Sequence, residues 1–293
     1  MRLSMTKQIV HIVYQVRKDH PTMGIRDIYY KVRPTGIGRD CFEDICRAEG
    51  LMISRPVNWT KTTDSRGVIR FEDLSKTLSV TSINQLWQSD ITYFELGGRF
   101  YYLTFIQDTY SKRIVGHSVS KTLRTEHTTL AALTMAVRNR RGMDISGVVL
   151  HSDGGGQYYS GSFLSYTKKN GIVNSMCQYP WDNGMAERLN GVIKNNYIKY
   201  YRIKTYDQLV KSVDRIVSLY NHEKPHSRLK RKTPIEFEIK YCKLVSTNKA
   251  EGDGVIRRKI SIGRGIGPLR LKQTKPQDLD VISAKMTHIQ VGG

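Results

Sequence analysis

The strongest constraint on the fold is the order of apolar segments that begins at residue 85. Three runs come first, and all three are rich in aromatic and β-branched residues: LWQSDITYFEL, RFYYLTFIQD and SKRIVGHSVS. The short breaks between them, at LGG and at DTYS, are typical of turns. The three runs therefore predict an antiparallel, three-stranded meander.

Helical and strand-like segments alternate after the meander. Helices are expected at residues 124–139 and 162–169, from about Asp182 onward and at 206–220, with short apolar strands at 145–152 and 172–175. The order βββαβαβα is that of an RNase H-like α/β fold, whose later strands are reached through helical crossovers and run parallel. We expect this core, with its helical extension, to span residues 85–240.

Three short helices are expected ahead of the core, at residues 7–17, 25–32 and 39–48. The segments HPTMG and RPTGIG separate them and break helices. Each helix carries apolar residues at helical spacing, so the three faces can pack together. Residues 1–52 therefore predict a helix-turn-helix-like DNA-binding module whose third helix presents Arg39 to a groove. A three-helix spacer without DNA contact is the alternative.

Two polar segments flank the core. Residues 53–84 have no sustained hydrophobic period and predict a basic linker. Beyond Tyr241 the chain contains no aromatic residue, so residues 241–293 can bury little surface and predict a basic C-terminal tail.

The charge of the chain indicates a polyanionic partner. Lysine and arginine number 47 against 26 acidic residues, which gives a formal net charge of +21. Nucleic acid is the partner that such a charge favours. No apolar stretch approaches the roughly 20 residues that a membrane span needs, and four scattered cysteines do not make a disulfide framework. We expect a cytoplasmic, nucleoid-associated protein with no membrane partner.

Three carboxylates stand where phosphoryl-transfer chemistry would need them. Asp90 lies inside the first strand-like run, where an isolated carboxylate is costly unless it is paired or bound to metal. Asp153 follows the apolar strand VVLHS, at the strand end where α/β sheets form their sites. Glu187 lies on the predicted helix, and Lys194, two turns later on the same face, is placed to touch a phosphate.

Hard oxygen ligands of this kind suit Mg²⁺ or Mn²⁺, which keep bound water and accept phosphate oxygens as further ligands. Two such ions can clamp the attacking and leaving oxygens of an in-line phosphoryl transfer. The sequence therefore predicts a site for two Mg²⁺ (or Mn²⁺) ions at Asp90, Asp153 and Glu187.

Residues near the carboxylates leave some interpretations open. Asp108 follows a strand and is read as an ordinary turn aspartate. His151 and Gln157 could orient DNA or water, or make structural hydrogen bonds. Aromatic residues near the site either stack on unpaired bases or pack the core: Tyr158, Tyr159 and Trp181.

The spacing of the carboxylates resembles that of a DDE integrase core: 62 residues separate Asp90 from Asp153, and 33 separate Asp153 from Glu187. The surrounding segments resemble the second-frame transposase of IS3-family insertion sequences. They are HPTMGIRDIYYKVR, HSDGGGQYYS, PWDNGMAERLNGVIK and YNHEKPHSRLKRKTP. The resemblance covers roughly residues 10–240.

The resemblance implies an enzyme that recognises the terminal inverted repeats of an insertion sequence. It would hydrolyse the DNA to expose a 3′-hydroxyl, and that hydroxyl would attack target DNA. The resemblance also implies a homo-oligomer on double-stranded DNA, and a first-frame protein or fusion as partner. Carried over, the catalytic and metal-binding residues are Asp90, Asp153 and Glu187, and Lys194 is a DNA contact. The other expected DNA contacts are Arg39, Asn183, Arg188 and His226.

Two other functions fit parts of the sequence. A non-catalytic DNA-binding regulator would need the basic charge and the helical module, but it would have no use for the three carboxylates. An RNase H-like nuclease that hydrolyses without joining would share every metal ligand with a transposase. Only strand-transfer products would distinguish those two enzymes.

Overall fold

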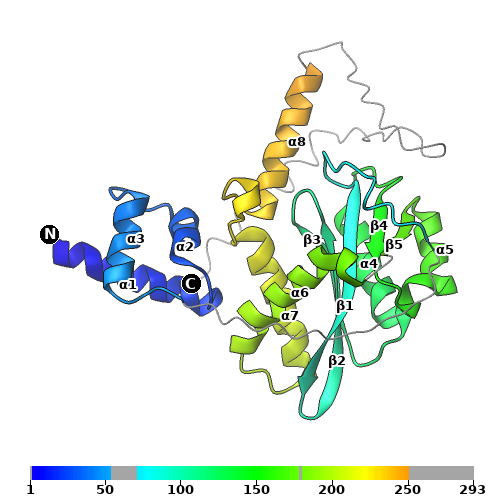
Figure 1. Ribbon diagram of the computed structural model, residues 1–293, viewed down its shortest axis with the longest axis horizontal. Coiled ribbons are helices and arrows are strands. Elements are labelled where there is room, and N and C mark those ends of the chain that lie inside the picture. The colour runs from blue at the N-terminus through cyan, green and yellow to red at the C-terminus, as the bar shows by residue number, and fades with distance from the viewer. Residues whose placement is uncertain (1, 54–70, 178–179, 251–293) are drawn as a thin grey trace.

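A five-stranded mixed sheet with helices on both faces forms the centre of the molecule (Figure 1). The computed structural model describes residues 2–53, 71–177 and 180–250. In chain order the strands are β1 (Leu86–Leu96), β2 (Arg99–Asp108), β3 (Ile114–Ser120), β4 (Val149–Ser152) and β5 (Val173–Met176). Their order in the sheet is β3-β2-β1-β4-β5, with β1, β2 and β3 antiparallel and β4 and β5 parallel to β1. The predicted meander and the parallel strands that follow it are confirmed.

The helices after the meander also lie close to their expected positions. They are α4 (Thr129–Asn139), α5 (Gly161–Lys169), α6 (Gly184–Asn196), α7 (Tyr206–His222) and α8 (Pro234–Ala250). Short 3₁₀ turns join them: η1 (Thr125–His127), η2 (Gly156–Tyr159), η3 (Pro180–Asn183), η4 (Ile198–Tyr200) and η5 (Ser227–Leu229). The helix expected from residue 124 is interrupted, because Thr128 leaves helical geometry at ψ −97° between η1 and α4.

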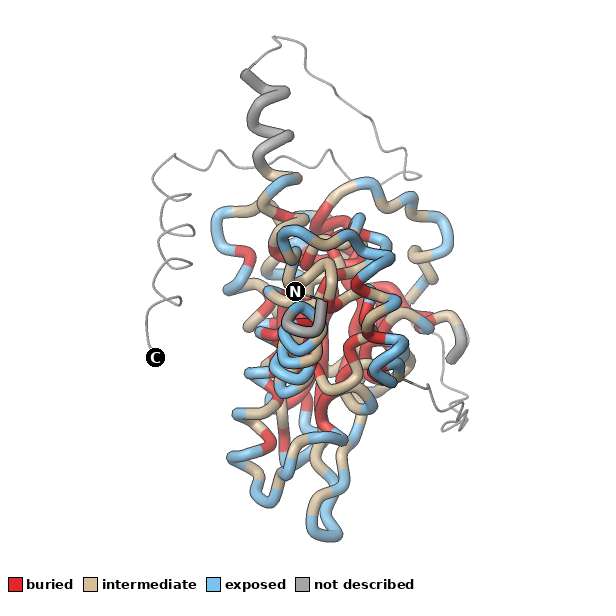
Figure 2. Tube along the Cα trace, turned by 90° about the vertical axis from the view of Figure 1, so that its left-hand side faces the viewer, coloured by how far each residue is buried: buried red, intermediate tan, exposed pale blue. Residues whose placement is uncertain are grey.

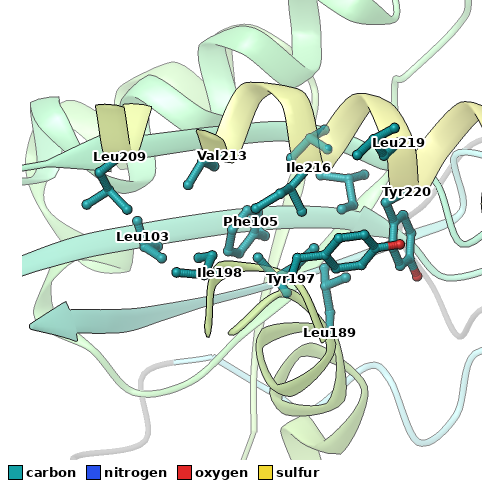
Figure 3. Packing of buried hydrophobic residues seen from close by; sticks show 13 residues of the cluster. Leu103, Phe105, Leu189, Tyr197, Ile198, Leu209, Val213, Ile216, Leu219 and Tyr220 are labelled. Carbon is teal, nitrogen blue, oxygen red and sulfur yellow. The ribbon is translucent and has the colours of Figure 1, made fainter. Parts of the chain in front are cut away.

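The sheet is buried on both faces because side chains alternate along each strand. Leu103 and Phe105 of β2 point toward α6 and α7, where Figure 3 shows them packed against Ile198 and Ile216. The other face carries a second cluster, in which Trp87, Ile106 and Val115 meet α4 and α5. Figure 2 shows the buried residues running through the centre of this core.

Gly116 lets α4 lie directly on β3. A Cβ at this position would meet the Ala132 carbonyl oxygen at 2.2 Å and the Ala136 Cβ at 2.9 Å. We expect Gly116→Ala to lower the free energy of unfolding by about 1–3 kcal/mol or more, because α4 must move away from the sheet. Urea denaturation measures this, with Gly191→Ala in α6 as the control, since nothing lies within 4 Å of its added Cβ. Equal stability of the two variants would contradict the close packing.

The three N-terminal helices are confirmed as α1 (Arg2–Asp19), α2 (Ile25–Val32) and α3 (Arg39–Ala48). The first begins five residues earlier than expected. They enclose a small core of their own, formed by Ile9, Val13, Ile28, Phe42, Cys46 and their neighbours. Their use in DNA binding stays a prediction.

Polar side chains join these helices to the α/β core that follows them. His20, which is 1 % exposed, lies with Nδ1 3.0 Å from the Tyr197 hydroxyl and Nε2 3.2 Å from the Glu223 carboxylate. Glu223 also accepts from Lys31, and these bonds lower the pKa of Glu223 to about 2. Arg231 pairs with Asp27 across the same junction. The N-terminal helices are therefore joined to the chain that follows α6 mainly by charged and hydrogen-bonding groups.

Helix α8 is held to the sheet by a buried ion-pair network. Arg140 at the end of α4 is 1 % exposed and donates to both oxygens of Glu238 in α8, at 2.8 and 2.6 Å. The same guanidinium lies 3.4 Å from Asp108, and Arg113 completes the network at 2.7 Å from Glu238. Asp108 also accepts hydrogen bonds from the Tyr110 and Ser111 N–H groups, so it is the turn aspartate that the sequence predicts. Its ion pair with Arg140 is a second, buried role.

The flanking segments are described in part. Residues 54–70 of the predicted linker and 251–293 of the predicted tail lie outside the described residues. Helix α8 continues to Ala250, past the expected core boundary at residue 240. Within residues 71–84, the Leu74 N–H donates to Ser175 Oγ at 3.0 Å, and Lys76 pairs with Asp182 at 2.8 Å. This part of the chain therefore lies along β5 and the turn that precedes α6.

Candidate active site

Asp90 lies in β1 on the face that α6 covers. It pairs across the sheet with Phe105, so its side chain points to the same face as that ring. One carboxylate oxygen accepts the Ile91 N–H at 2.9 Å and the other accepts the Asn190 side-chain amide at 2.8 Å. Burial, followed by the charges of Asp153 and Glu187, raises the pKa of Asp90 to about 7. The negative charges of Asp153 and Glu187 therefore both act on Asp90.

Asp153 directly follows β4, the strand that pairs in parallel with the start of β1. Its Oδ1 accepts the Gly155 N–H at 3.1 Å, and a Cβ on Gly155 would approach that oxygen to 3.0 Å. Glycine at this position therefore keeps the turn tight around the carboxylate. Burial raises the pKa of Asp153.

Glu187 lies in the first turn of α6 and is exposed, in contrast to the two aspartates. Asn190 follows it by three residues, so the two side chains lie on one side of the helix. Helix α6 thereby presents a carboxylate and an amide toward the end of the sheet that carries Asp90 and Asp153. Among the described residues, no three carboxylate, histidine or cysteine side chains are arranged so that they could hold a metal ion as they stand.

Lys194 lies one turn beyond Asn190 on α6. Its ammonium donates to Thr92 Oγ1 at 3.3 Å and lies 4.9 Å from the centre of the Tyr93 ring. Burial lowers the pKa of Lys194. The lysine therefore lies beside β1, at the position of Thr92, two residues along the strand from Asp90, and its contact with a phosphate stays a prediction.

Two of the residues expected to contact DNA, Asn183 and His226, make structural contacts within the chain, and their DNA contacts stay predictions. Asn183 is 2 % exposed, and its amide donates to the Ser89 carbonyl at 3.1 Å, so it fastens η3 to β1. His226 packs edge-on against the Tyr220 ring at 4.9 Å. Burial, and then Lys224 and Lys112, lower the pKa of His226 to about 3, which leaves a neutral ring at ordinary pH. Packing within the chain therefore accounts for the positions of both residues.

Two other expected DNA contacts remain accessible. Arg188 is exposed on α6 next to Glu187. Arg39 is exposed at the first position of α3, although its guanidinium donates to Asp40 at 2.8 and 2.6 Å and lies 3.7 Å from Glu43. Those acidic neighbours reduce the positive charge that Arg39 can offer to a phosphate. The DNA-binding roles of both arginines stay predictions.

Sequence reasoning missed Asn190, which holds Asp90 in place. Its position three residues after Glu187 was the available signal, since that spacing puts both on one helix side. Tyr158 and His151, for which both a DNA contact and a structural role were open, make structural hydrogen bonds. Tyr158 is 4 % exposed with its hydroxyl 2.8 Å from Ser89 Oγ, and His151 is fully buried with Nδ1 3.0 Å from Ser175 Oγ.

The chain is similar to known integrases and transposases. Residues 81–179 match the integrase core domain family, and residues 169–234 match a second integrase core domain family. The transposase for insertion sequence element IS629 of Shigella sonnei is 30 % identical over 80 % of this chain and 79 % of its own. The insertion element IS600 uncharacterized 31 kDa protein, also of Shigella sonnei, is 27 % identical over 84 % of this chain and 90 % of its own.

One solved structure shows the same fold. It is the simian T-cell lymphotropic virus intasome in complex with PP2A regulatory subunit B56 gamma, with a TM-score of 0.52 and 16 % identity over 77 % of this chain and 71 % of its own. No helix in the described ranges is both long and apolar enough to cross a membrane.

The mixed sheet and the matching families define an RNase H-like integrase core, the fold of polynucleotidyl transferases. The chain belongs to the transposases of insertion sequences, which act in DNA transposition.

Proposed function

We propose that Asp90, Asp153 and Glu187 hold two Mg²⁺ (or Mn²⁺) ions, and that the chain cleaves insertion-sequence ends and joins them to target DNA. The observation that carries the proposal is the setting of Asp90, a half-buried carboxylate whose pKa is raised to about 7 by burial and by the charges of Asp153 and Glu187. A fold gains nothing from holding like charges together, and a cation among them would relieve the repulsion.

The residues present fit a hard divalent cation. All three proposed ligands are carboxylates, the donors that Mg²⁺ and Mn²⁺ prefer. Asp90 and Asp153 are fixed by N–H donors at 2.8–3.1 Å, whereas Glu187 stands on the exposed start of α6. The two aspartates would therefore be held in position before an ion binds, and the side chain of Glu187 would move to complete the site.

Bound ions would activate the nucleophile and stabilise charge on the attacking and leaving oxygens. In cleavage, the oxygen of water forms a bond to phosphorus, and the phosphorus bond to the 3′-oxygen of the element end breaks, leaving a 3′-hydroxyl. In joining, that hydroxyl oxygen bonds to a target phosphorus while the target's own 3′-oxygen leaves. One phosphodiester replaces another, so no external energy source is needed.

The surrounding side chains would position the DNA. Asn190 donates to Asp90 and keeps both of its oxygens oriented. Lys194 would neutralise a phosphate oxygen near Thr92, and Arg188 is exposed on the same helix for a further backbone contact. The partners we propose are double-stranded DNA, further copies of this chain on paired ends and a first-frame protein or fusion. Residues 1–52 would serve as a DNA-binding module.

Labelled duplexes that carry the terminal repeats of the element test the proposal. We expect Mg²⁺-dependent cleaved and joined strands from the wild-type protein, and a loss on the order of a thousandfold for Asp153→Asn, since the ligand supports several kcal/mol of transition-state stabilisation. Asp207→Asn removes an exposed aspartate on α7 and is the matched control.

The products separate the competing functions. Joined strands that need both the metal and Asp153 support a transposase. Metal-dependent cleavage that never yields joined strands would favour a nuclease. DNA binding with no metal-dependent product would leave a DNA-binding regulator as the remaining function.

A further inference from the structure

Two large aromatic side chains are exposed on the β1–β2 hairpin. Tyr93 is 48 % exposed and Phe100 is 51 % exposed. In the hairpin register Tyr93 pairs with Tyr102 and Phe100 with Glu95, which makes Tyr93 and Phe100 diagonal neighbours on one face. Their rings meet edge to face, with centroids 5.3 Å apart and an interplanar angle of 86°. Much of both rings is therefore free to contact another molecule.

A cation connects this pair to the site. Lys194 touches Thr92, which shares a strand face with Asp90, and also lies over the ring of Tyr93, which points to the opposite face. The side chain must therefore cross the edge of β1. That edge is accessible because the pairing of β1 with β4 ends at Gln88, so no strand covers β1 beside Thr92 and Tyr93. We call Tyr93, Phe100 and Lys194 the aromatic edge patch.

The chemistry of the aromatic edge patch selects its occupant. Aromatic rings beside a lysine ammonium bind single-stranded nucleic acid, because every base can stack and the cation meets the backbone. Without DNA between them, a second copy of this chain would be a poor occupant, since each copy has a formal net charge of +21. At about 3.3 Å per strand residue, Tyr93 lies roughly 10 Å along β1 from Asp90, about the rise of three base-pair steps of duplex DNA.

We propose that the aromatic edge patch stacks on an unpaired nucleobase a few nucleotides from the phosphate at the carboxylates. This inference rests on the proposed function, because it identifies the DNA at that site as frayed or single-stranded beside the cut. Tyr93 and Phe100 supply the stacking surface, and Lys194 holds the backbone between the base and Asp90.

Binding in EDTA tests this proposal without any chemistry. The probes are labelled duplexes of arbitrary sequence, either blunt or with a five-nucleotide dT extension on either strand. We expect wild-type protein to prefer one extended duplex over the blunt one by roughly five- to a hundredfold, which is the effect of one stacked base. The Tyr93→Leu/Phe100→Ala double variant should lose this preference and keep its affinity for blunt DNA. A 2-aminopurine placed in the extension should be quenched by wild-type protein alone.

Three controls make the outcome decisive. Phe100→Trp keeps a stacking ring and should retain the preference. Tyr200→Ala removes another aromatic residue, 53 % exposed, in η4 after α6 and should retain it as well. Thermal unfolding checks that each variant folds, and should the double variant fail, Phe100→Ser replaces it. An unchanged preference, or an equal loss on blunt DNA, overturns the proposal.

Sedimentation distinguishes the remaining occupant. A double variant that changes from oligomer to monomer without DNA would assign the patch to a second copy and overturn base stacking. Failure of this binding test leaves the metal-dependent cleavage assay untouched. An inactive protein could likewise still show the preference for extended DNA, so the two proposals fail independently.

Discussion

Replacement of Asp90 by asparagine is expected to abolish strand cleavage and joining while making the metal-free protein more stable at alkaline pH. The activity should fall on the order of a thousandfold or more, because asparagine is a weak ligand for a hard cation. The stability gain follows from the pKa of Asp90, which burial and the neighbouring charges of Asp153 and Glu187 raise to about 7 from its ordinary 3.8.

The sign of the pH dependence follows from that shift. A carboxyl group with a raised pKa in the folded state favours its protonated form there, so ionising it weakens the fold. Wild-type stability should therefore fall, relative to Asp90→Asn, as the pH rises from about 4 to about 7, and stay lower above that. An asparagine at position 90 can still accept the Ile91 N–H. Its own NH₂ group would face the NH₂ group of Asn190, so one hydrogen bond is lost, which offsets about 1 kcal/mol of the gain in stability.

Unfolding temperatures in EDTA at pH 4 and pH 8 measure this effect, at roughly 2–4 °C for each kcal/mol. Asp207→Asn again serves as the exposed control. A wild-type protein as stable as Asp90→Asn at pH 8 would show that neither burial nor the neighbouring charges raise the pKa of Asp90. Retained activity in Asp90→Asn would remove the residue from the proposed metal site.

Replacement of Arg140 by methionine is expected to be the most destabilising of the substitutions considered. Arg140 has no exposed side-chain surface, and its loss would leave Asp108 and Glu238 buried together with only Arg113 to compensate. Removing one partner from such a network costs about 3–5 kcal/mol. Urea denaturation measures the loss, and Arg138→Ala, an exposed arginine of the same helix, should stay within about 0.5 kcal/mol of wild type.

A second substitution and an acid titration test the network itself. Adding Glu238→Gln to Arg140→Met should recover part of the lost stability, because it removes one of the unpaired charges. Burial alone would raise the pKa of Glu238, but Arg140, Arg113 and Ser111 hold it down to about 2. The stabilisation by Glu238 is therefore complete above its ordinary pKa of 4.5 and is lost as the pH falls toward 2. An Arg140→Met protein as stable as Arg138→Ala would contradict this account.

Local patterns were sufficient to predict the sheet and the positions of the carboxylates. Asp90 was expected inside a strand, Asp153 after a parallel strand and Glu187 near the start of a helix, and each is confirmed there. Strand alternation and helix periodicity carry this information over a few residues, so it can be read from the sequence directly. Their roles as metal ligands stay predictions.

Contacts between distant segments could not be predicted in the same way. Asp108 looked like a turn residue and is one, but its buried partner Arg140 lies 32 positions later and carries no local signal. Asn183 and His226 lie in motifs that favoured DNA contact, yet tertiary packing buries the first and neutralises the second. Whether a polar side chain faces solvent or the interior depends on segments that packed against it from elsewhere in the chain.

The buried network has a consequence for the order of events during synthesis. Asp108 and Arg140 leave the ribosome well before Glu238, which emerges about 100 residues after Arg140. At a synthesis rate of roughly 5–20 residues per second, Glu238 emerges on the order of ten seconds after Arg140. During that interval the sheet lacks the carboxylate that neutralises its buried arginine. A nascent chain that stops before Glu238 should therefore be a substrate for proteolysis, and full-length chains alone would accumulate.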